Sequence, residues 1–403
     1  MSSAVRSPVD PELLRPVVAG ALPGARTLPA EAYTSQTVFD WEVEHFFEAG
    51  WLCVGRAEEL GEPGDQKAFR VGEEGVLVVR DLDGNLQAFH NTCRHRGHEL
   101  LTPGETRNLK AIKCPYHAWV YGLDGSLNGA PRFGDMPGFD KRELPLVRAR
   151  IAVWHGWLFL NASGDALPFE TCVGNLDGLL APWEIERMFV ADGHEYVIEA
   201  NWKTITENYH ECYHCPSIHP ALCEVTPVNS GENLPHEGLW VGGTMWLKDF
   251  AETMSLSGRS EGVRIRGLDE DQARQVFYVG LFPNLLISLH PDYVMTHRFE
   301  PLGPGRTRVE CLWLFPPEAK GLPGFSSDYA SEFWDLTNRE DWAACESVMR
   351  GLRSRGFRQG LFAWNEDEVH VFMAMVAQGY LDGGVRQPPQ VHEPDGITVS
   401  SSR

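Results

Sequence analysis

Hydrophobic and polar positions alternate in short runs along the first part of this chain. Between residues 51 and 161 each run is only a few residues long and is bounded by turns that contain glycine. This pattern is typical of small β-strands. Residues 75–80 and 86–89 predict a hairpin around a turn at 81–85, and residues 153–160 predict the strand that closes an all-β unit.

A different pattern begins near residue 170. Residues 170–225 contain helical pieces, and longer apolar runs predict antiparallel strands at 239–247, 275–280, 285–289, 293–300 and 307–315. Residues 327–380 carry apolar side chains at steps of three or four, which predicts helix. A sheet with helices packed on one face indicates an α+β domain.

These patterns divide the chain into four segments. Residues 1–44 form an N-terminal arm, with a helix predicted from residue 37 to residue 50, that we expect to pack on the α+β domain. Residues 45–162 form the all-β domain and residues 163–383 the α+β domain. Residues 384–403 are rich in glycine, proline and serine and predict a loose tail.

Two loops of the all-β domain each pair one cysteine with one histidine. Cys93 and His95 read as C-x-H, and Cys114 and His117 as C-x-x-H. Two thiolates and two imidazoles can hold a [2Fe–2S] cluster in which histidines replace cysteines on one iron. A structural zinc site is the alternative, but zinc motifs usually pair cysteine with cysteine and histidine with histidine.

A second group of metal-ligand types lies in the α+β domain. His214 and His219 fall within a short His-rich stretch, and two histidines with one carboxylate can hold an Fe(II) that activates O₂. Five residues on a straight helix point about 140° apart, so one metal would not meet both rings. Pro216 predicts that the helix kinks or ends there, which can turn His219 round. His210 and His214, four residues apart, stay open as an alternative pair.

The carboxylate ligand must come from another part of the chain. The candidates lie in the predicted C-terminal helix: Asp335, Glu340, Asp341, Asp367 and Glu368. Asp341 shares a helix face with Cys345 and Val348 and is expected to point inward, whereas Glu340 is expected to face solvent. Glu211 lies one turn before His214, where it either hydrogen-bonds that ligand or is a solvated surface group.

Composition limits the class of protein. The 403 residues carry a formal net charge of −21, which argues against nucleic acid and anionic membranes as partners. The chain has nine cysteines, and its start has no apolar signal core, so we expect no disulfide scaffold and a cytoplasmic location. No apolar run reaches the length of about 18 residues that indicates a membrane span.

Two motifs in this order resemble the large (α) subunits of the Rieske non-heme iron oxygenases over residues 35–380: Cys93-x-His95…Cys114-x₂-His117 and Asn201-Trp202-Lys203…Glu207-Asn208-Tyr209…His214-x₄-His219-Pro220. The resemblance implies a [2Fe–2S] cluster in the all-β domain and a helix-grip catalytic domain with Fe(II) in its cavity. It implies O₂ as oxidant, NAD(P)H electrons through a separate flavin reductase or ferredoxin, and a homotrimer. Asp341 matches the family's carboxylate ligand, and Glu211 its acidic bridge between subunits.

Glutamate at position 211 and the segment 340–354 resemble the branch that oxidises quaternary ammonium compounds, although Met349 replaces the usual glutamine. The implied reaction is hydroxylation and N-demethylation of a small, glycine betaine-like substrate. The alternative is a ring-hydroxylating dioxygenase that acts on an aromatic acid. Cation–π binding would use aromatic residues on the predicted cavity strands and loops. The candidates are Trp246, Tyr278, Phe282, Tyr293 and Phe299.

Two other classes of protein use the same residue types. A Rieske electron carrier would need only the first motif, and the additional domain with its own histidine pair argues against it. A zinc hydrolase would use His210 and His214. The chain carries no flavin or NAD motif, so an oxygenase of this kind needs a reductase partner.

Overall fold

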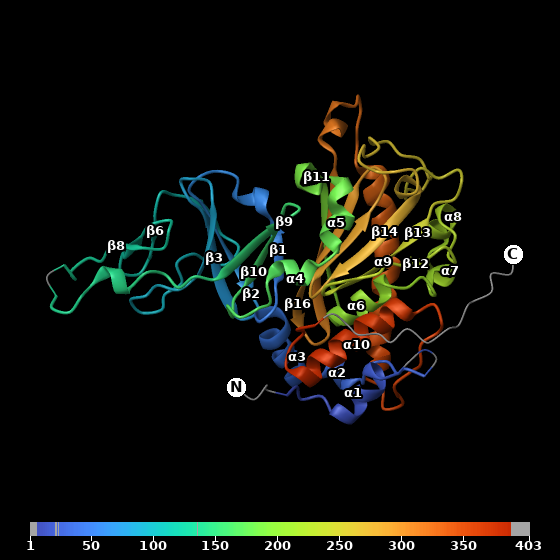
Figure 1. Cartoon of the computed structure of the whole chain (residues 1–403), viewed down its shortest axis with the longest axis horizontal. Coiled ribbons are helices and arrows are strands. Elements are labelled where there is room, and N and C mark those ends of the chain that lie inside the picture. Colours follow the sequence, from blue (N-terminus) through green and yellow to red (C-terminus); the bar gives the residue numbers. More distant parts are fainter. Residues whose placement is uncertain (1–5, 21, 23, 135, 388–403) are drawn as a thin grey trace. The chain divides into compact units, whose positions relative to one another are not determined.

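The computed structural model describes residues 6–20, 22, 24–134 and 136–387 (Figure 1). Contacts divide the chain into two units. One is Glu42–Phe169, and the other joins Met1–Trp41 to Glu170–Arg403. Most of the predicted tail, residues 388–403, lies outside the described residues.

The Glu42–Phe169 unit contains three antiparallel sheets, with strand orders β1-β10-β9, β4-β3-β2-β5 and β6-β7-β8. The strands are β1 (Leu52–Arg56), β2 (Asp65–Val71), β3 (Glu74–Arg80), β4 (Leu86–His90), β5 (Thr106–Asn108), β6 (Ile112–Lys113), β7 (Val120–Tyr121), β8 (Leu127–Gly129), β9 (Arg150–Trp154) and β10 (Trp157–Asn161). Short helical turns occupy Val43–Glu48, Ala57–Leu60 and Lys141–Glu143.

The predicted hairpin is confirmed, because β3 and β4 pair antiparallel. The Asp81 carboxylate accepts hydrogen bonds from the backbone N–H groups of Asp83 and Asn85, which closes the turn. The single strand predicted at 153–160 is wrong. His155 and Gly156 both have positive φ, 45° and 83°, and make a tight turn between β9 and β10. The apolar run is continuous across this turn, so the sequence pattern conceals it.

The second unit is built on one seven-stranded antiparallel sheet, ordered β11-β17-β16-β15-β14-β13-β12. Its strands are β11 (Phe189–Ile198), β12 (Glu232–Asn233), β13 (Trp240–Trp246), β14 (Gln275–Leu281), β15 (Leu285–Leu289), β16 (Val294–Gly303) and β17 (Arg306–Phe315). The five predicted strands are confirmed. β11 was not predicted, because this edge strand is largely half-exposed and mixes charged with apolar residues.

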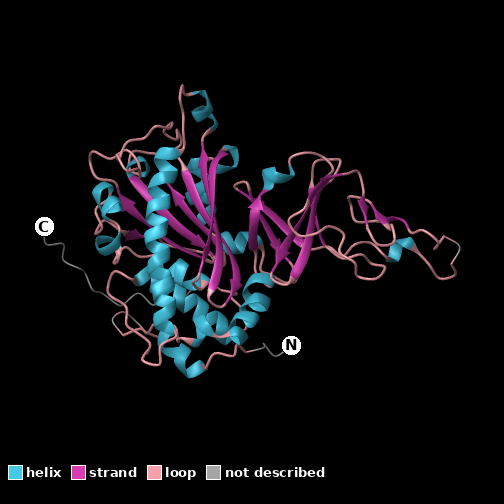
Figure 2. Cartoon of the chain, turned by 180° about the vertical axis from the view of Figure 1, so that it is seen from behind, coloured by secondary structure: helices cyan, strands magenta, loops and turns pink. Residues whose placement is uncertain are grey.

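Helices of this unit precede, interrupt and follow the sheet. They are α1 (Pro11–Val18), α2 (Glu31–Thr34), α3 (Gln36–Glu42, at the boundary between the units), α4 (Phe169–Val173), α5 (Leu176–Leu180), α6 (Trp202–Tyr209), α7 (Cys215–Ile218), α8 (Pro220–Val225), α9 (Asp328–Leu352) and α10 (Asp367–Asp382). Short 3₁₀ turns lie at Ala181–Trp183, Ile185–Arg187, Gln272–Arg274 and Pro317–Gly321. Figure 2 shows α9 running along one face of the sheet, with α10 below it.

The one helix predicted at 327–380 is two helices. Residues 353–366 between α9 and α10 contain Gly356 and Gly360 and are not helical. The N-terminal arm packs on this part of the molecule, because α1 contacts α10. The mixture of a β unit and an antiparallel sheet with long C-terminal helices confirms the α+β class. Within the described residues, every helix is too short or too polar to cross a lipid bilayer.

Candidate active site

Two loops of the β unit fold in the same way around their cysteines. In each loop the cysteine carbonyl accepts an N–H from the fourth residue on, which is Gly97 after Cys93 and Ala118 after Cys114. The cysteine N–H donates to the carbonyl of the fifth residue on. Gly97 and Ala118 both have positive φ, 72° and 58°. The two turns therefore hold both cysteines in the same backbone arrangement, with His95 two residues after its cysteine and His117 three residues after its own.

The four side chains of these loops come together. Cys93 and Cys114 are almost fully buried and lie beside each other, and the His95 and His117 ring centroids are 4.6 Å apart. His95 Nδ1 is buried without a hydrogen-bond partner among the described residues. Burial raises the pKa of the Cys93 thiol, so a thiolate at this position needs positive charge beside it. An orphaned imidazole nitrogen and two buried thiols fit a [2Fe–2S] cluster.

Tyr121 supports this site from β7. Its hydroxyl lies 3.3 Å from Cys93 Sγ and accepts the N–H of Arg94 at 3.0 Å. His95 stacks on Trp119 with ring centroids 4.9 Å apart. Hydrogen bonds to a ligand sulfur and the burial of the site are the features with which a protein sets a cluster's reduction potential.

The second site begins where α6 ends. His214 stands directly before α7, and His219 stands between α7 and α8. Pro216 lies in the first turn of α7, where its missing N–H leaves no helical hydrogen bond unmade. The predicted kink or end of a helix at Pro216 is therefore wrong in form, because a helix begins there. Two separate short helices, rather than one bent helix, place both rings on the same side.

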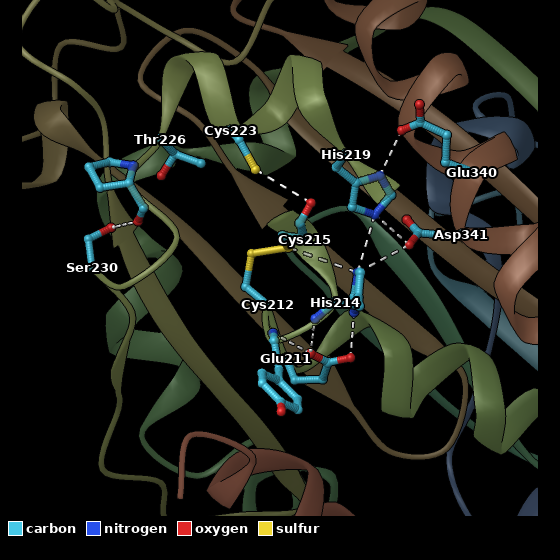
Figure 3. Close-up of a disulfide and its surroundings, with 12 residues drawn as sticks. Glu211, Cys212, His214, Cys215, His219, Cys223, Thr226, Ser230, Glu340 and Asp341 are labelled. Carbon is cyan, nitrogen blue, oxygen red and sulfur yellow. Dashed lines mark hydrogen bonds and ion pairs between the residues drawn. A yellow bond between two sulfur atoms is a disulfide. The ribbon is translucent and has the colours of Figure 1, made fainter. Parts of the chain in front are cut away.

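His214, His219 and Asp341 converge on one point (Figure 3). His219 Nε2 lies 3.2 Å from His214 Nε2 and 2.8 Å from Asp341 Oδ1, and His214 Nε2 lies 3.4 Å from the same oxygen. Ligand atoms that bind one divalent ion at about 2.1 Å and at right angles are separated by about 3 Å. The donor set fits a two-histidine, one-carboxylate iron site.

A carboxylate holds the second nitrogen of each histidine. His214 Nδ1 donates to Glu211 Oε1, and His219 Nδ1 lies 2.7 Å from Glu340 Oε2. Burial lowers the pKa of His214, but the hydrogen bonds to Asp341 and Glu211 outweigh it and raise this pKa to about 9. The expectation that Glu340 faces solvent is wrong, because the α9 backbone brings Glu340 against one edge of the His219 ring and Asp341 against the other.

The alternative ligand His210 is not part of this group. Its side chain is buried, and Nδ1 lies 3.8 Å from Glu368 Oε2. The ring packs over Gly280, where an added Cβ would approach His210 Nε2 to 2.3 Å. Burial lowers the pKa of His210 to about 3, so the ring is neutral.

One disulfide joins Cys212 to Cys215 on either side of Tyr213 and His214 (Figure 3). We expected no disulfide scaffold, and this bond does not connect distant elements, because it spans three residues of one loop. Cys215 Sγ lies 3.9 Å from His214 Nε2.

A cavity of about 460 Å³ opens onto the three ligand side chains. Three of its aromatic rings form a connected wall. The Tyr209 and Tyr278 ring centroids are 5.7 Å apart, and those of Tyr278 and Trp334 are 6.4 Å apart, both edge to face. The Tyr209 hydroxyl lies 2.8 Å from Ser288 Oγ on β15, which fixes its ring.

Of the five aromatic residues predicted for substrate binding, only Tyr278 lines this cavity. Trp246 lies at the end of β13, Phe282 packs against Trp202, and the Tyr293 hydroxyl is held by Met254 and Trp334. Phe299 is buried on β16. These four rings are not among the cavity-lining residues, because strand position alone does not tell which face of the sheet a ring occupies.

The residues missed are Tyr209, Trp334 and Trp364. Tyr209 closes the Glu207-Asn208-Tyr209 motif, which was the available signal. Trp334 lies about two turns before Asp341 on α9, and Trp364 lies in the irregular segment before α10. Glu368, considered above as a metal ligand, lines the cavity instead.

Comparisons with known proteins agree with this geometry. A sequence model of the Rieske [2Fe-2S] domain matches residues 50–140, and one of the ring hydroxylating alpha subunit (catalytic domain) matches residues 185–381. The carnitine monooxygenase oxygenase subunit of Escherichia coli K12 is 31% identical over 83% of this chain and 86% of that protein. The chain belongs to the Rieske non-heme iron oxygenases, as an α subunit. Members of this family use a Rieske [2Fe–2S] cluster, non-heme iron and O₂, with electrons from a reductase.

Other relatives lie in the quaternary ammonium branch. The glycine betaine monooxygenase oxygenase subunit of Chromohalobacter salexigens is 29% identical over 84% of this chain and 82% of that protein. The crystal structure of the quaternary ammonium Rieske monooxygenase CntA in complex with L-carnitine superposes with a TM-score of 0.75 at 27% identity, covering 94% of this chain and all of that one. Naphthalene 1,2-dioxygenase from a Rhodococcus species, 21% identical, shares the fold.

Proposed function

We propose that this protein hydroxylates an N-methyl group of a small quaternary ammonium compound, with O₂ and electrons from a separate reductase. The observation that carries the proposal is the position of His214, His219 and Asp341 beneath a cavity walled by three aromatic rings. Aromatic faces attract quaternary ammonium groups, with about 0.5–2 kcal/mol per contact. The relatives named for carnitine and glycine betaine support the same substrate class.

We assign Cys93, His95, Cys114 and His117 to the cluster, and His214, His219 and Asp341 to the iron. When bound, the two groups supply electrons and reductive activation of O₂. The surrounding residues orient the ligands. Glu211 and Glu340 accept the Nδ1–H groups of the two histidines, which leaves both Nε2 lone pairs free for the metal.

The reaction balances without a further reactant. One methyl C–H becomes C–OH, one oxygen atom of O₂ leaves as water, and NAD(P)H supplies the two electrons. The resulting N-hydroxymethyl group breaks at its C–N bond to give formaldehyde, a tertiary amine and a proton. Tyr209, Tyr278 and Trp334 hold the ammonium group during the first step by their ring faces.

The same proposal includes a homotrimer in which the cluster of one subunit passes electrons to the iron of its neighbour across Glu211, which serves as a hydrogen-bonded bridge and is not itself reduced. Glu211 supports this role by its contact with the ligand His214. Its neighbour Tyr213 is 62% exposed, so the loop is accessible at the surface of this chain.

Formaldehyde release tests the proposed function. The purified protein, with a reductase and NADH, is supplied with choline, glycine betaine, carnitine and several aromatic acids. We expect formaldehyde release with one of the quaternary amines, in proportion to the amount of that amine consumed. An aldehyde made from the substrate's alcohol carbon would overturn N-demethylation, and a ring-hydroxylated acid would overturn the substrate class.

A further inference from the structure

The cavity at the candidate iron site is lined by further carboxylates besides those near the metal ligands. Apart from the groups around the metal ligands, its carboxylates are Glu232, Asp367 and Glu368. No lysine or arginine of the described residues lines it. Glu232 and Asp367 are exposed, whereas the Glu368 side chain is only 12% exposed.

Glu368 is held at the first turn of α10 with no counter-charge. Its Oε1 is fully buried and has no hydrogen-bond partner within the described part of the chain. The carboxylate packs over Gly243 of β13, where an added Cβ would come within 2.6 Å of Oε1, so this glycine makes room for it. His210 Nδ1 is 3.8 Å from Oε2, beyond hydrogen-bond distance, and both His210 nitrogens also lack partners among these residues.

A buried, charged carboxylate without a hydrogen-bond or ionic partner costs free energy, unless a bound ligand supplies that partner. Burial raises the pKa of Glu368 well above its ordinary value, and the neighbouring Asp367 adds to this. The side chain is therefore neutral in the empty cavity and would become charged beside a cation. The uncharged His210 ring offers it no cation within the protein.

We propose that Glu368, with the rings of Tyr209, Tyr278 and Trp334, makes this enzyme select quaternary ammonium ions that carry no carboxylate, such as choline, over zwitterions such as glycine betaine and carnitine. The proposal rests on the function proposed above and departs from the glycine betaine-like substrate implied by the sequence. A monocation would supply the positive partner that Glu368 lacks. The carboxylate of a zwitterion would enter a cavity with several carboxylates and no lysine or arginine.

The uncharged polar side chains of the cavity suit a substrate whose other end is a neutral group such as a hydroxyl. Asparagine and threonine side chains line it and can hydrogen-bond a hydroxyl without a change of charge. They are Asn208, Asn229, Asn233, Thr244, Thr337 and Asn365.

Equilibrium binding under anaerobic conditions tests this proposal on the intact, metal-loaded protein. Isothermal titration compares choline with glycine betaine, L-carnitine and 3,3-dimethylbutan-1-ol, the uncharged carbon analogue of choline. We expect choline to bind at least about tenfold more tightly than either zwitterion, because like charges in a binding site are strongly unfavourable. The uncharged analogue should also bind more weakly, by about tenfold.

Glu368→Gln keeps the size of the side chain and removes its charge. We expect the Kd for choline to rise by about tenfold or more and the preference over glycine betaine to shrink. The Kd for the uncharged analogue should not change. Glu368→Asp, which keeps the charge, should preserve the order of ligands. Glu332→Gln is the matched control, because Glu332 is exposed on α9 and does not line the cavity.

The outcomes separate the two proposals. Turnover of glycine betaine or carnitine, with tighter binding than choline, would overturn the role of Glu368 and leave the proposed function intact. Absence of binding and turnover for every quaternary amine would overturn both. If Glu368→Gln fails to fold, the order of wild-type affinities and the Glu368→Asp variant decide the question.

Discussion

Glu340 and Asp341, adjacent on α9, contact opposite nitrogens of the same imidazole. Glu340 Oε2 lies 2.7 Å from His219 Nδ1, and Asp341 Oδ1 lies 2.8 Å from His219 Nε2. Because Glu340 accepts the Nδ1 proton, the lone pair of the neutral ring is on Nε2, which faces the metal position. One helix therefore supplies both the proposed ligand and the group that orients the neighbouring ligand.

Glu340→Ala should weaken iron binding by about 10–100-fold, the usual effect of losing a carboxylate behind a ligand histidine. The measurement is iron content after graded chelation, with the visible spectrum of the cluster as an internal reference. The cluster should be unaffected, because Glu340 belongs to the other unit. Glu332→Ala, on an exposed face of the same helix, is the control. Equal iron retention in both variants would remove Glu340 from this role.

The two metal sites should be separable by mutation. His214→Ala should lose the mononuclear iron and turnover but keep the colour of the cluster. Cys114→Ser should have the reverse effect, since a thiolate ligand of the cluster is gone. Iron analysis and the visible spectrum should give about three iron atoms per chain in the wild type and about two in His214→Ala. Loss of colour in His214→Ala would contradict the assignment.

Glu211→Gln tests the proposed role of Glu211 as the bridge between a neighbouring subunit's cluster and the iron site. Glutamine can still accept the Nδ1–H of His214 through its oxygen, so both metals should stay bound. The lost charge should slow the transfer of electrons to the iron by about 10–100-fold. The rate of cluster reoxidation, after reduction and then addition of O₂ and substrate, measures this step. A wild-type rate would show that Glu211 only orients His214.

The sequence predicted the parts of these sites that are local. Cys93 and His95, and His214 and His219, are close along the chain, so their spacing reveals the chemistry. Contacts between residues that are far apart in the sequence could not be predicted from such spacing. Glu340 reaches His219 across 121 positions, and the cavity brings Tyr209 to Trp334. Helical periodicity placed Asp341 inward correctly, but its companion Val348 is 51% exposed.

Local backbone conformation was the second feature that the sequence pattern did not predict. Pro216 predicted an interruption near the histidines, but the pattern could not distinguish a kink from two short helices. The positive φ at His155 divides one apolar run into β9 and β10. Both features depend on backbone angles that hydrophobic periodicity does not record.

Glu207 on α6 should make the stability of the protein depend on pH. Its Oε1 accepts a hydrogen bond from the Tyr33 hydroxyl at 2.7 Å, and burial raises the pKa of Glu207 from 4.5 to about 8. In the unfolded chain the carboxyl releases its proton near pH 4.5, whereas the folded protein retains it up to about pH 8. Stability is therefore lost as pH rises through this window, by at most about 1.4 kcal/mol per unit.

Glu207→Gln removes this titration while its amide oxygen can still accept from Tyr33. As the pH rises from 5.5 to 8.5, the variant should become more stable relative to the wild type. At the upper pH its Tm should be higher by about 2–4 °C for each kcal/mol by which its free energy of unfolding exceeds that of the wild type. Thermal denaturation at both pH values, with the exposed Glu224→Gln as control, measures the difference. Parallel pH dependence in wild type and Glu207→Gln would mean that the folded protein ionises Glu207 as readily as the unfolded chain does.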